Sequence, residues 1–268
     1  MRRWLLTVVL ATALYIPSQA QMAQNGMTGF HTVACVKVSP EKASDFRSWA
    51  ASDVHKLAQA RVDAGTVSTW FLLKSVEPQG KSADCDYLSI WVYPGAPPEP
   101  MTKEQLGADL KKAAINSTAQ QFMDRRDSLT TLISNSLFQN RTQVGAIKTG
   151  DYLLVNYMKA ADVEEWVAFE KKVWQPMAEA LVKDGASSGW SLNVQVLPGG
   201  SDLKFEGVTV DIYPSWDAVF KQDPHFLERF RRVHPDMEFG TTFEKFDKLR
   251  TMVAIHLYSV IEMVTAAK

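Results

Sequence analysis

The stretch that decides the fold runs from Val173 to Pro198 and reads VWQPMAEALVKDGASSGWSLNVQVLP. Its first part has helical spacing and stops at a glycine, and its second part is a strand that opens with a tryptophan and ends at a proline. The same order appears from Val54 to Pro78, VHKLAQARVDAGTVSTWFLLKSVEP, at a constant offset of 120 positions. The chain is therefore predicted to be a tandem duplication.

The duplication extends along most of the chain without a gap. Two long copies favour paired globular halves, because a solenoid needs three or more units. The identical pairs at the 120-residue offset include Gly65/Gly185, Ser68/Ser188, Trp70/Trp190, Leu72/Leu192, Pro78/Pro198, Tyr93/Tyr213 and Leu137/Leu257.

Periodicity within the second copy gives the order of its elements. Alternating apolar residues predict strands, and apolar residues three and four apart predict a helix that ends at Gly185. The order is strand, helix, strand, strand, helix, strand, which is the ferredoxin-like βαββαβ unit. The predicted ranges are 152–159, 161–184, 190–197 and 205–213, then a partly helical stretch to about 247 and a strand from 249 to about 261.

The predicted fold is therefore α+β, with two ferredoxin-like βαββαβ repeats whose sheets pack together as an intramolecular α/β barrel. The first repeat is expected over residues 21–147 and the second over residues 148–268. Each repeat covers one sheet face with its helices, and closing the two sheets on each other covers the other face.

The first 20 residues have the features of a secretory signal peptide. Arg2 and Arg3 precede an apolar run, and Ser18-Gln19-Ala20 is a small-x-small cleavage site. The run is shorter than the roughly 20 residues that cross a bilayer, so a cleaved signal is favoured over an anchor. We expect a periplasmic or secreted protein that has no membrane segment after cleavage.

Composition narrows the class of partner. The 268-residue chain has a formal net charge of −1, which argues against a nucleic-acid ligand because phosphate binding needs a basic excess. The two cysteines, Cys35 and Cys85, could form a disulfide in an exported chain or remain buried thiols. The second repeat has Val155 and Phe205 at these positions, so the fold itself does not require a bridge.

The element order and the repeated G-x-x-S-x-W and P-x-G signatures resemble the dimeric α/β-barrel superfamily in a fused form. The signatures lie at residues 65–70 with 78–80 and at residues 185–190 with 198–200. Trp174-Gln175-Pro176 also resembles a W-x-P motif of a group of exported bacterial proteins. The superfamily includes cofactor-free monooxygenases, isomerases, haem enzymes of the chlorite-dismutase type and NIPSNAP-like proteins, so the resemblance does not select a function.

The space between the sheets is the expected binding site, because ligands usually occupy concave apolar spaces with a few polar groups. If the more apolar face of each strand packs on the helices, the polar residues face this lumen. With the helix residue Glu170 added, the candidate ligand-binding residues are Asn156, Asn193, Thr209, Tyr258, Trp91 and Glu170. The same reasoning places Tyr87, Ser89, Tyr93, Ser134, Ser136, Phe138, Gln195, Tyr213, Met252 and Ala254 in the lumen.

His256 and Asp211 are the candidate catalytic residues. His256 stands where the first repeat has Ser136, so it is not required by the fold; it could be a general base, a haem ligand or a structural histidine bonded to Asn156 or Tyr258. Asp211 lies among apolar strand residues, where burial would shift its pKa, unless the strand end leaves it solvated.

Three other features have structural interpretations as alternatives to function. Glu170 could be a solvated flank of the helix, and Trp174 with Pro176 is expected to pack around a helix kink. His225 and His234 are nine residues apart, do not share a helix face, and predict no metal site.

No sequence motif specifies a reaction, so enzyme and binding protein remain alternatives. The first hypothesis is an exported protein that binds a small molecule between the repeats. The second is a cofactor-free monooxygenase or isomerase, and the third is a haem enzyme, although no motif requires a cofactor. A solid lumen that serves only packing or partner binding is a fourth alternative, and a homodimer is also open.

Overall fold

The computed structural model describes residues 29–80 and 83–266, and the expected signal peptide, residues 1–20, lies outside them. The strands of the described residues are β1 (Phe30–Lys37), β2 (Thr69–Glu77), β3 (Tyr87–Tyr93), β4 (Thr131–Gly145), β5 (Tyr152–Ala160), β6 (Gly189–Leu197), β7 (Gly207–Tyr213) and β8 (Arg250–Thr265). They confirm the strands predicted for residues 152–261.

The helices lie outside the strands. They are α1 (Ala43–Trp49), α2 (His55–Asp63), α3 (Lys103–Lys112), α4 (Ala119–Leu129), α5 (Val163–Lys183), α6 (Trp216–Phe220), α7 (Phe226–Val233) and α8 (Phe239–Leu249). A 3₁₀ turn (Pro40–Lys42) precedes α1, and a π-helical turn (Ala50–Val54) joins α1 to α2.

The strands form one closed barrel in the order β4-β1-β3-β2-β8-β5-β7-β6, with β6 returning to β4. Every neighbouring pair is antiparallel. The strands of residues 30–145, the first half, are contiguous, and so are those of residues 152–265, the second half. The pairs β2–β8 and β4–β6 join the halves, so the predicted barrel closes by hydrogen bonds between strand edges.

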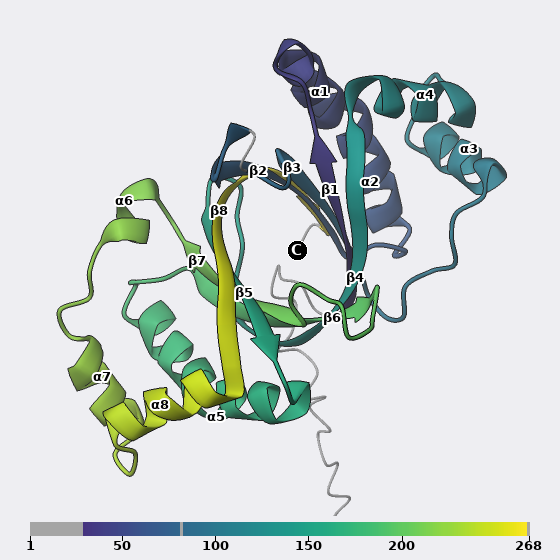
Figure 1. Ribbon diagram of the computed structural model, residues 1–268. Coiled ribbons are helices and arrows are strands. Elements are labelled where there is room, and N and C mark those ends of the chain that lie inside the picture. Colours follow the sequence, from purple (N-terminus) through teal and green to yellow (C-terminus); the bar gives the residue numbers. More distant parts are fainter. Residues whose placement is uncertain (1–28, 81–82, 267–268) are drawn as a thin grey trace, which may run out of the picture.

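Helices α1–α4 cover one side of the barrel and α5–α8 the other (Figure 1). Trp49 and Trp70 lie in the core between the first half and its helices, and Trp166 and Trp190 lie in the matching core of the second half. Fully burying one large apolar side chain contributes roughly 1.5–3 kcal/mol, so these outer cores hold the helices on the barrel.

Helix α5 shows how the sequence sets an element. The Asp162 side chain accepts a hydrogen bond from the Glu165 amide at 2.9 Å, which caps the start of the helix. Gly185 has a φ of 72° just beyond the end, a conformation that glycine adopts without strain. The buried face includes Val173 and Met177, as the predicted stripe requires, and Pro176 lies inside the helix.

Several elements of the two halves have matching bounds. β6 and β7 begin and end 120 positions after β2 and β3, and α8 does so relative to α4. Pro78 and Pro198 of the repeated signature both follow cis peptide bonds.

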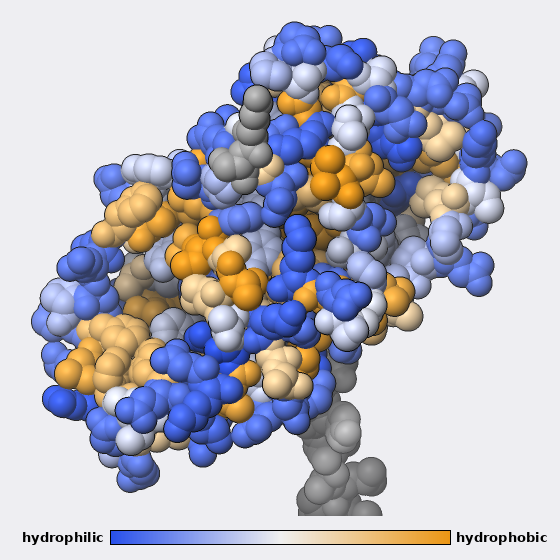
Figure 2. Space-filling model, in the orientation of Figure 1, coloured by the Kyte–Doolittle hydropathy of each residue, from blue (hydrophilic) through white to orange (hydrophobic). Residues whose placement is uncertain are grey.

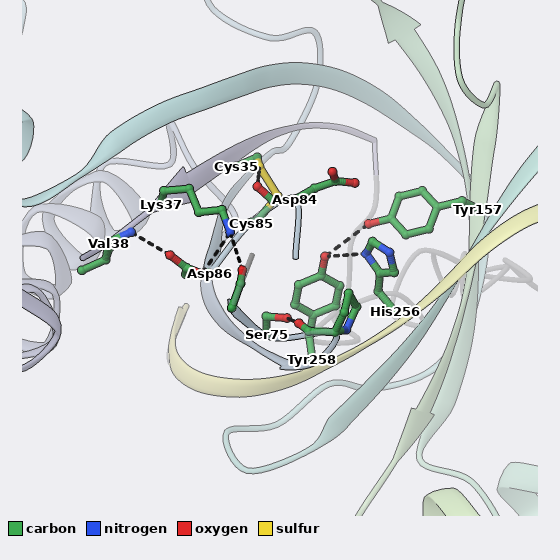
Figure 3. Close-up of a disulfide and its surroundings, with 12 residues drawn as sticks. Cys35, Lys37, Val38, Ser75, Asp84, Cys85, Asp86, Tyr157, His256 and Tyr258 are labelled. Carbon is green, nitrogen blue, oxygen red and sulfur yellow. Dashed lines mark hydrogen bonds and ion pairs between the residues drawn. A yellow bond between two sulfur atoms is a disulfide. The ribbon is translucent and has the colours of Figure 1, made fainter. Parts of the chain in front are cut away.

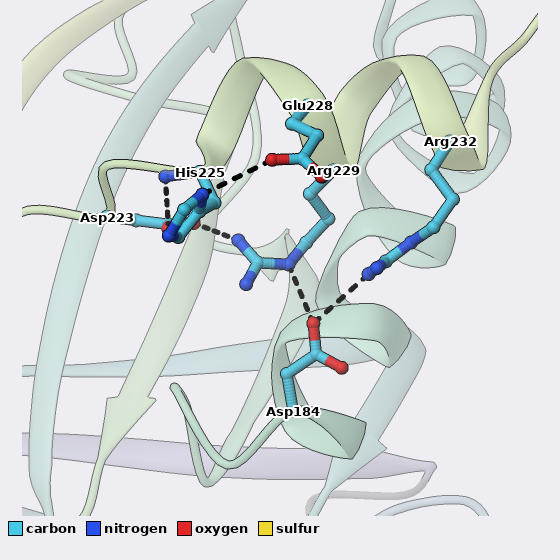
Figure 4. Close-up of polar contacts among 6 residues, drawn as sticks. All are labelled: Asp184, Asp223, His225, Glu228, Arg229 and Arg232. Carbon is cyan, nitrogen blue, oxygen red and sulfur yellow. Dashed lines mark hydrogen bonds and ion pairs between the residues drawn. The ribbon is translucent and has the colours of Figure 1, made fainter.

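An ion-pair network attaches α7 to the end of α5 (Figure 4). Arg229 lies between Asp184, which accepts from Nε at 3.1 Å, and Asp223, which accepts from its Nη1. Arg232 donates to the same Asp184 oxygen at 3.1 Å. His225 pairs with Glu228 at 3.2 Å on the exposed side of this network.

The view in Figure 2 shows apolar residues gathered over α6 among hydrophilic neighbours. Trp216 and Phe220 of this helix are 47% and 62% exposed and contact each other at a ring-centroid distance of 4.8 Å. Within the described residues, no helix combines the length and the apolar character that a membrane crossing needs.

Candidate functional site

A cavity of about 660 Å³ occupies one end of the barrel lumen. Exposed residues of β4, β8 and the β6–β7 loop, Ile133, Val253 and Lys204, form its mouth. Below the cavity, buried apolar side chains fill the barrel, including Phe71, Val92, Ile147, Ile212 and Val260. The walls are mainly aliphatic, with Val33, Leu73, Leu88, Ile90, Leu153, Val155, Val208 and Val210.

A short chain of polar side chains lies along β5 and β8 near the mouth (Figure 3). The Tyr258 hydroxyl is 3.3 Å from Nδ1 of His256 and 3.4 Å from the Tyr157 hydroxyl. The rings of Tyr157 and His256 also meet edge to face, with centroids 5.0 Å apart. Strand alternation brings these three residues together, because Val155 pairs with His256 across β5 and β8 and every second residue faces inward.

Burial sets the protonation states of these three polar side chains. Burial raises the pKa of Tyr157 well above its ordinary value, with smaller contributions from Tyr258 and the Asp84 carboxylate. Burial likewise raises the pKa of Tyr258. Burial lowers the pKa of His256 below 6.5, and Asp84 opposes this effect. Near neutral pH both hydroxyls therefore keep their protons and the imidazole is uncharged.

A disulfide anchors the loop that carries Asp84. Cys35 of β1 is bonded to Cys85, with the Cα atoms 5.2 Å apart, which answers the question that the sequence left open. Both cysteines line the cavity, and the Asp84 side chain points toward Tyr157 (Figure 3). The bridge therefore fixes an acidic side chain beside the polar chain at the mouth.

His31 lies deeper in the cavity and was not singled out by the sequence. It is 2% exposed, lines the cavity and stacks on Phe138 with centroids 5.6 Å apart. Its Nδ1 is buried and has no hydrogen-bond partner within the described residues. Leaving such a group unpaired costs roughly 1–3 kcal/mol. Burial lowers its pKa to about 3, so the ring is neutral at ordinary pH.

The predicted lumen placement is wrong for Asn156, Thr209 and Asp211, which lie on the outer, helix-facing side of the sheet. Residues on either side of them, such as Val155 and Val210, face the cavity instead. The physical reason is that the interior of a closed barrel is as dry as the face beneath the helices. Apolar alternation therefore marks two buried faces and does not identify which one is the lumen.

On the outer side, Asp211 belongs to a buried polar cluster under α5. Asn156 donates to its Oδ2 at 2.9 Å, and Trp174 also donates to this carboxylate. Burial raises the pKa of Asp211 to about 6, although the bonds from Asn156 and Trp174 oppose the shift. Burial of the Tyr213 hydroxyl raises its pKa to about 12, and the nearby Asp211 carboxylate adds to the shift. Asp211 is consequently remote from any ligand in the cavity.

Glu170 adds an ion pair to this cluster, so the alternative of a solvated helix flank is wrong. It is 2% exposed, and its Oε1 accepts from Trp166 Nε1 at 3.0 Å and from Arg250 Nε at 3.1 Å. Burial raises the pKa of Glu170, while Arg250 opposes the shift. These contacts join α5 to the start of β8, and they give the buried Glu170 carboxylate the partners that it needs.

The remaining candidates divide between the two faces. Trp91 lies on the outer face, 5.9 Å from the ring of Trp70 and beneath Arg61, so its lumen placement is wrong. The same correction applies to Tyr87, Ser89, Tyr93 and Tyr213, which alternate with inward residues of β3 and β7. It applies to Met252 as well, because a register shift in the β5–β8 pairing sets it opposite Met158 of the outer core. The lumen placement is confirmed for His256, Tyr258, Asn193, Gln195, Ser134, Ser136, Phe138 and Ala254.

Asn193 has partners within the chain. Its Nδ2 donates to the Ser191 hydroxyl at 3.0 Å, and its Oδ1 accepts from Asn140 at 2.9 Å. Among the described residues that line the cavity, His31 is the one with a buried polar atom that lacks a hydrogen-bond partner.

The two histidines near α7 have separate surroundings. His234 is buried and donates through Nε2 to the Val173 carbonyl at 2.8 Å, whereas His225 is exposed. Across residues 29–80 and 83–266, no group of three or more His, Cys, Asp or Glu side chains is arranged to hold a metal ion.

No protein-family model and no curated protein matches the chain. Among solved structures, a proposed monooxygenase from Lactobacillus acidophilus NCFM has a TM-score of 0.55 and 10% identity, covering 89% of this chain and 96% of that chain. A proposed monooxygenase from Fusobacterium nucleatum subsp. nucleatum has a TM-score of 0.53 and 9% identity, and the match covers 89% of this chain and 94% of that chain. An anthrone oxidase-like protein has a TM-score of 0.50 and 12% identity, and the match covers 91% of this chain and 96% of that chain. These likenesses show the fold alone, an α+β barrel.

Proposed function

We propose that this chain binds a small, uncharged and largely apolar molecule inside its barrel. The observation that carries the proposal is the cavity of about 660 Å³, walled by aliphatic side chains and open beside His256 and Tyr157. An eight-stranded barrel is wide enough either to be filled by side chains or to hold one small ligand. Here side chains fill one end of the barrel lumen, and the cavity occupies the other end.

The lining favours an uncharged ligand. Burying an unpaired charge against aliphatic walls is costly. Asp84, Asp202 and Lys204 are charged residues of the lining, and all three are exposed near the mouth. A charged ligand would therefore find no opposite charge in the deeper part of the cavity.

The binding proposal is tested with the neutral fluorescent probe N-phenyl-1-naphthylamine. Its emission should rise on titration with the wild-type protein, and Val33→Phe, which places a ring in the cavity, should weaken binding by at least about tenfold. Val196→Phe, on an exposed outward position of β6, is the matched control and should bind as the wild type does. Equal binding by both variants, or no binding by the wild type, would refute the proposal.

The finer organisation belongs to the same proposal. Two ferredoxin-like repeats, over residues 21–147 and 148–268, are supported by the matching element bounds and by the repeated signatures. Export to the periplasm or outside the cell is supported by the signal-like first 20 residues and by the Cys35–Cys85 disulfide, since disulfides persist in oxidising compartments. N-terminal sequencing of the mature protein, with Gln21 as the expected first residue, tests export.

A second candidate function is a cofactor-free monooxygenase, and the His256–Tyr258–Tyr157 chain favours it. If His256 donates its Nδ1 proton to Tyr258, Nε2 is left as a free acceptor in the cavity. Tyr258 can then donate to Tyr157. A neutral imidazole held in this tautomer can take a proton from an acidic C–H group of a bound substrate, and the carbanion can react with dioxygen.

Oxygen uptake with anthrone tests this candidate. The expected conversion of the CH₂ group to a carbonyl consumes one dioxygen and releases one water. Because the pKa of His256 is lowered, the rate should rise as pH increases through a value below 6.5 and then remain constant. His256→Ala should abolish that dependence, whereas an unchanged profile would remove His256 from the role of base.

The cavity fits haem poorly. Haem carries two carboxylates, and the lining offers Lys204 as a basic partner together with the acidic Asp84 and Asp202. His256, the histidine considered as an iron ligand, keeps Nε2 free because Nδ1 is bonded to Tyr258, so the poor fit rests on the charges of the lining. Haem is therefore not expected to bind, and the absence of a Soret band after haem addition is the expected result.

A further inference from the structure

His31 is the unexplained residue of the cavity. It lies on β1 opposite Val92 of β3 and Phe138 of β4, in the deeper part of the lumen. The residue is 2% exposed, yet its Nδ1 has no hydrogen-bond partner in the part of the chain that the structure describes. A buried polar atom is normally paired, so the unpaired Nδ1 of a ring that lines the cavity favours a partner from outside the chain, which Nδ1 can meet when the ring turns toward the cavity.

Neither packing nor charge accounts for a histidine at this position. Its neighbours across the sheet, Val92 and Phe138, are apolar, and an apolar residue would fill the space without an unpaired nitrogen. The neutral ring offers one donor and one acceptor. The residue 120 positions later is Asp151, which accepts a hydrogen bond from the Lys148 amide, so the barrel itself does not require an imidazole here.

An aromatic row leads from His31 to the mouth of the cavity. His31 stacks on Phe138, which stacks on Phe205 with centroids 6.4 Å apart and planes 14° apart. Phe205 meets Tyr157 at 4.7 Å, and Tyr157 meets His256 at 5.0 Å. The facing walls are aliphatic, so a flat apolar body can lie against this row with its leading end at His31.

We propose that His31 recognises an uncharged hydrogen-bonding group, such as a hydroxyl or carbonyl, at the leading end of a flat apolar ligand. This inference rests on the proposed binding function and adds the class of ligand and a specificity-determining residue. The imidazole would accept from a hydroxyl or donate to a carbonyl. A molecule of the same shape without that group would leave the nitrogen unpaired and bind less tightly.

Paired probes test the inference, namely 2-naphthol and naphthalene titrated by calorimetry. The wild type should prefer 2-naphthol, and His31→Phe should reduce that preference by about tenfold while still binding naphthalene. His225→Phe, at an exposed histidine beside α7, is the matched control and should keep the wild-type preference. If wild type and His31→Phe show the same preference, or the wild type shows none, the role of His31 is refuted while binding itself stands.

A measurement on the wild type covers the case in which His31→Phe does not fold. The ¹⁵N resonances of the His31 ring should move on addition of 2-naphthol and much less on addition of naphthalene. Equal responses to both probes would show that the ring does not pair with the hydroxyl, and would overturn the inference. A wild-type protein that binds neither probe would overturn the binding proposal together with it.

Discussion

Replacing Asp211 with asparagine should stabilise the protein relative to the wild type, and this gain should be larger at neutral pH than at acidic pH. Burial raises the Asp211 pKa from its ordinary value of 3.8 to about 6. The folded state therefore binds a proton more tightly than the unfolded state, so wild-type stability falls as pH rises through this interval. The gap corresponds to about 3 kcal/mol, at about 1.4 kcal/mol for each pKa unit. Asn156 can still donate to the asparagine oxygen.

Urea unfolding of both proteins between about pH 4 and about pH 7 measures this effect, because the difference in unfolding free energy isolates one carboxyl group. The difference, Asp211→Asn minus wild type, should increase by up to about 3 kcal/mol across the interval. Asp217→Asn, at an exposed position of α6, is the control and should change stability by less than about 0.5 kcal/mol. A difference that is flat, or that decreases with pH, would refute the assignment of Asp211 to a buried site.

Two further predictions concern contacts that hold the fold. The double variant Cys35→Ser, Cys85→Ser should lose about 4 kcal/mol in urea unfolding, because the bridge closes a segment with a sequence separation of 50; a loss below about 1 kcal/mol would contradict this. Glu170→Ala should lose about 3–5 kcal/mol because Arg250 is left without its buried partner. Glu164→Ala removes an exposed carboxylate and should cost much less than Glu170→Ala, so equal losses would contradict the burial argument.

The sequence was sufficient for the order and bounds of most elements. The alternation of β6, with Trp190 and Leu192 toward the helices and Asn193 inward, was predicted correctly because its two faces differ in polarity. The helical stripe of α5 was equally clear, since Val173 and Met177 recur at helical spacing. Local periodicity carries this information directly.

The faces of β5 and β7 were assigned the wrong way round for a physical reason. Both sides of these strands are buried, and the polar side carries Asn156 and Asp211 because Trp174 of α5 supplies a partner there. No local pattern reports a partner on another element. The alternation around Asn156 does offer a signal in retrospect, because placing Asn156 outward brings Tyr157 inward.

His31 was missed because its importance depends on residues far away in the sequence. The pairing of β1 with β4 brings it to Phe138, more than a hundred positions later, and barrel closure buries both. From the sequence alone His31 is a single polar residue at the start of a strand. Its unpaired nitrogen becomes evident only when the whole lumen is assembled.

Native mass spectrometry of the protein purified from its own source is the most direct test of the central claim, that the barrel lumen is a small-molecule site. We predict a species heavier than the mature chain by the mass of one small molecule, released on denaturation and depleted in Val33→Phe but not in Val196→Phe. Finding that molecule at the same occupancy in Val33→Phe would contradict the claim. Finding the unliganded chain alone, with no binding of N-phenyl-1-naphthylamine, would contradict it as well.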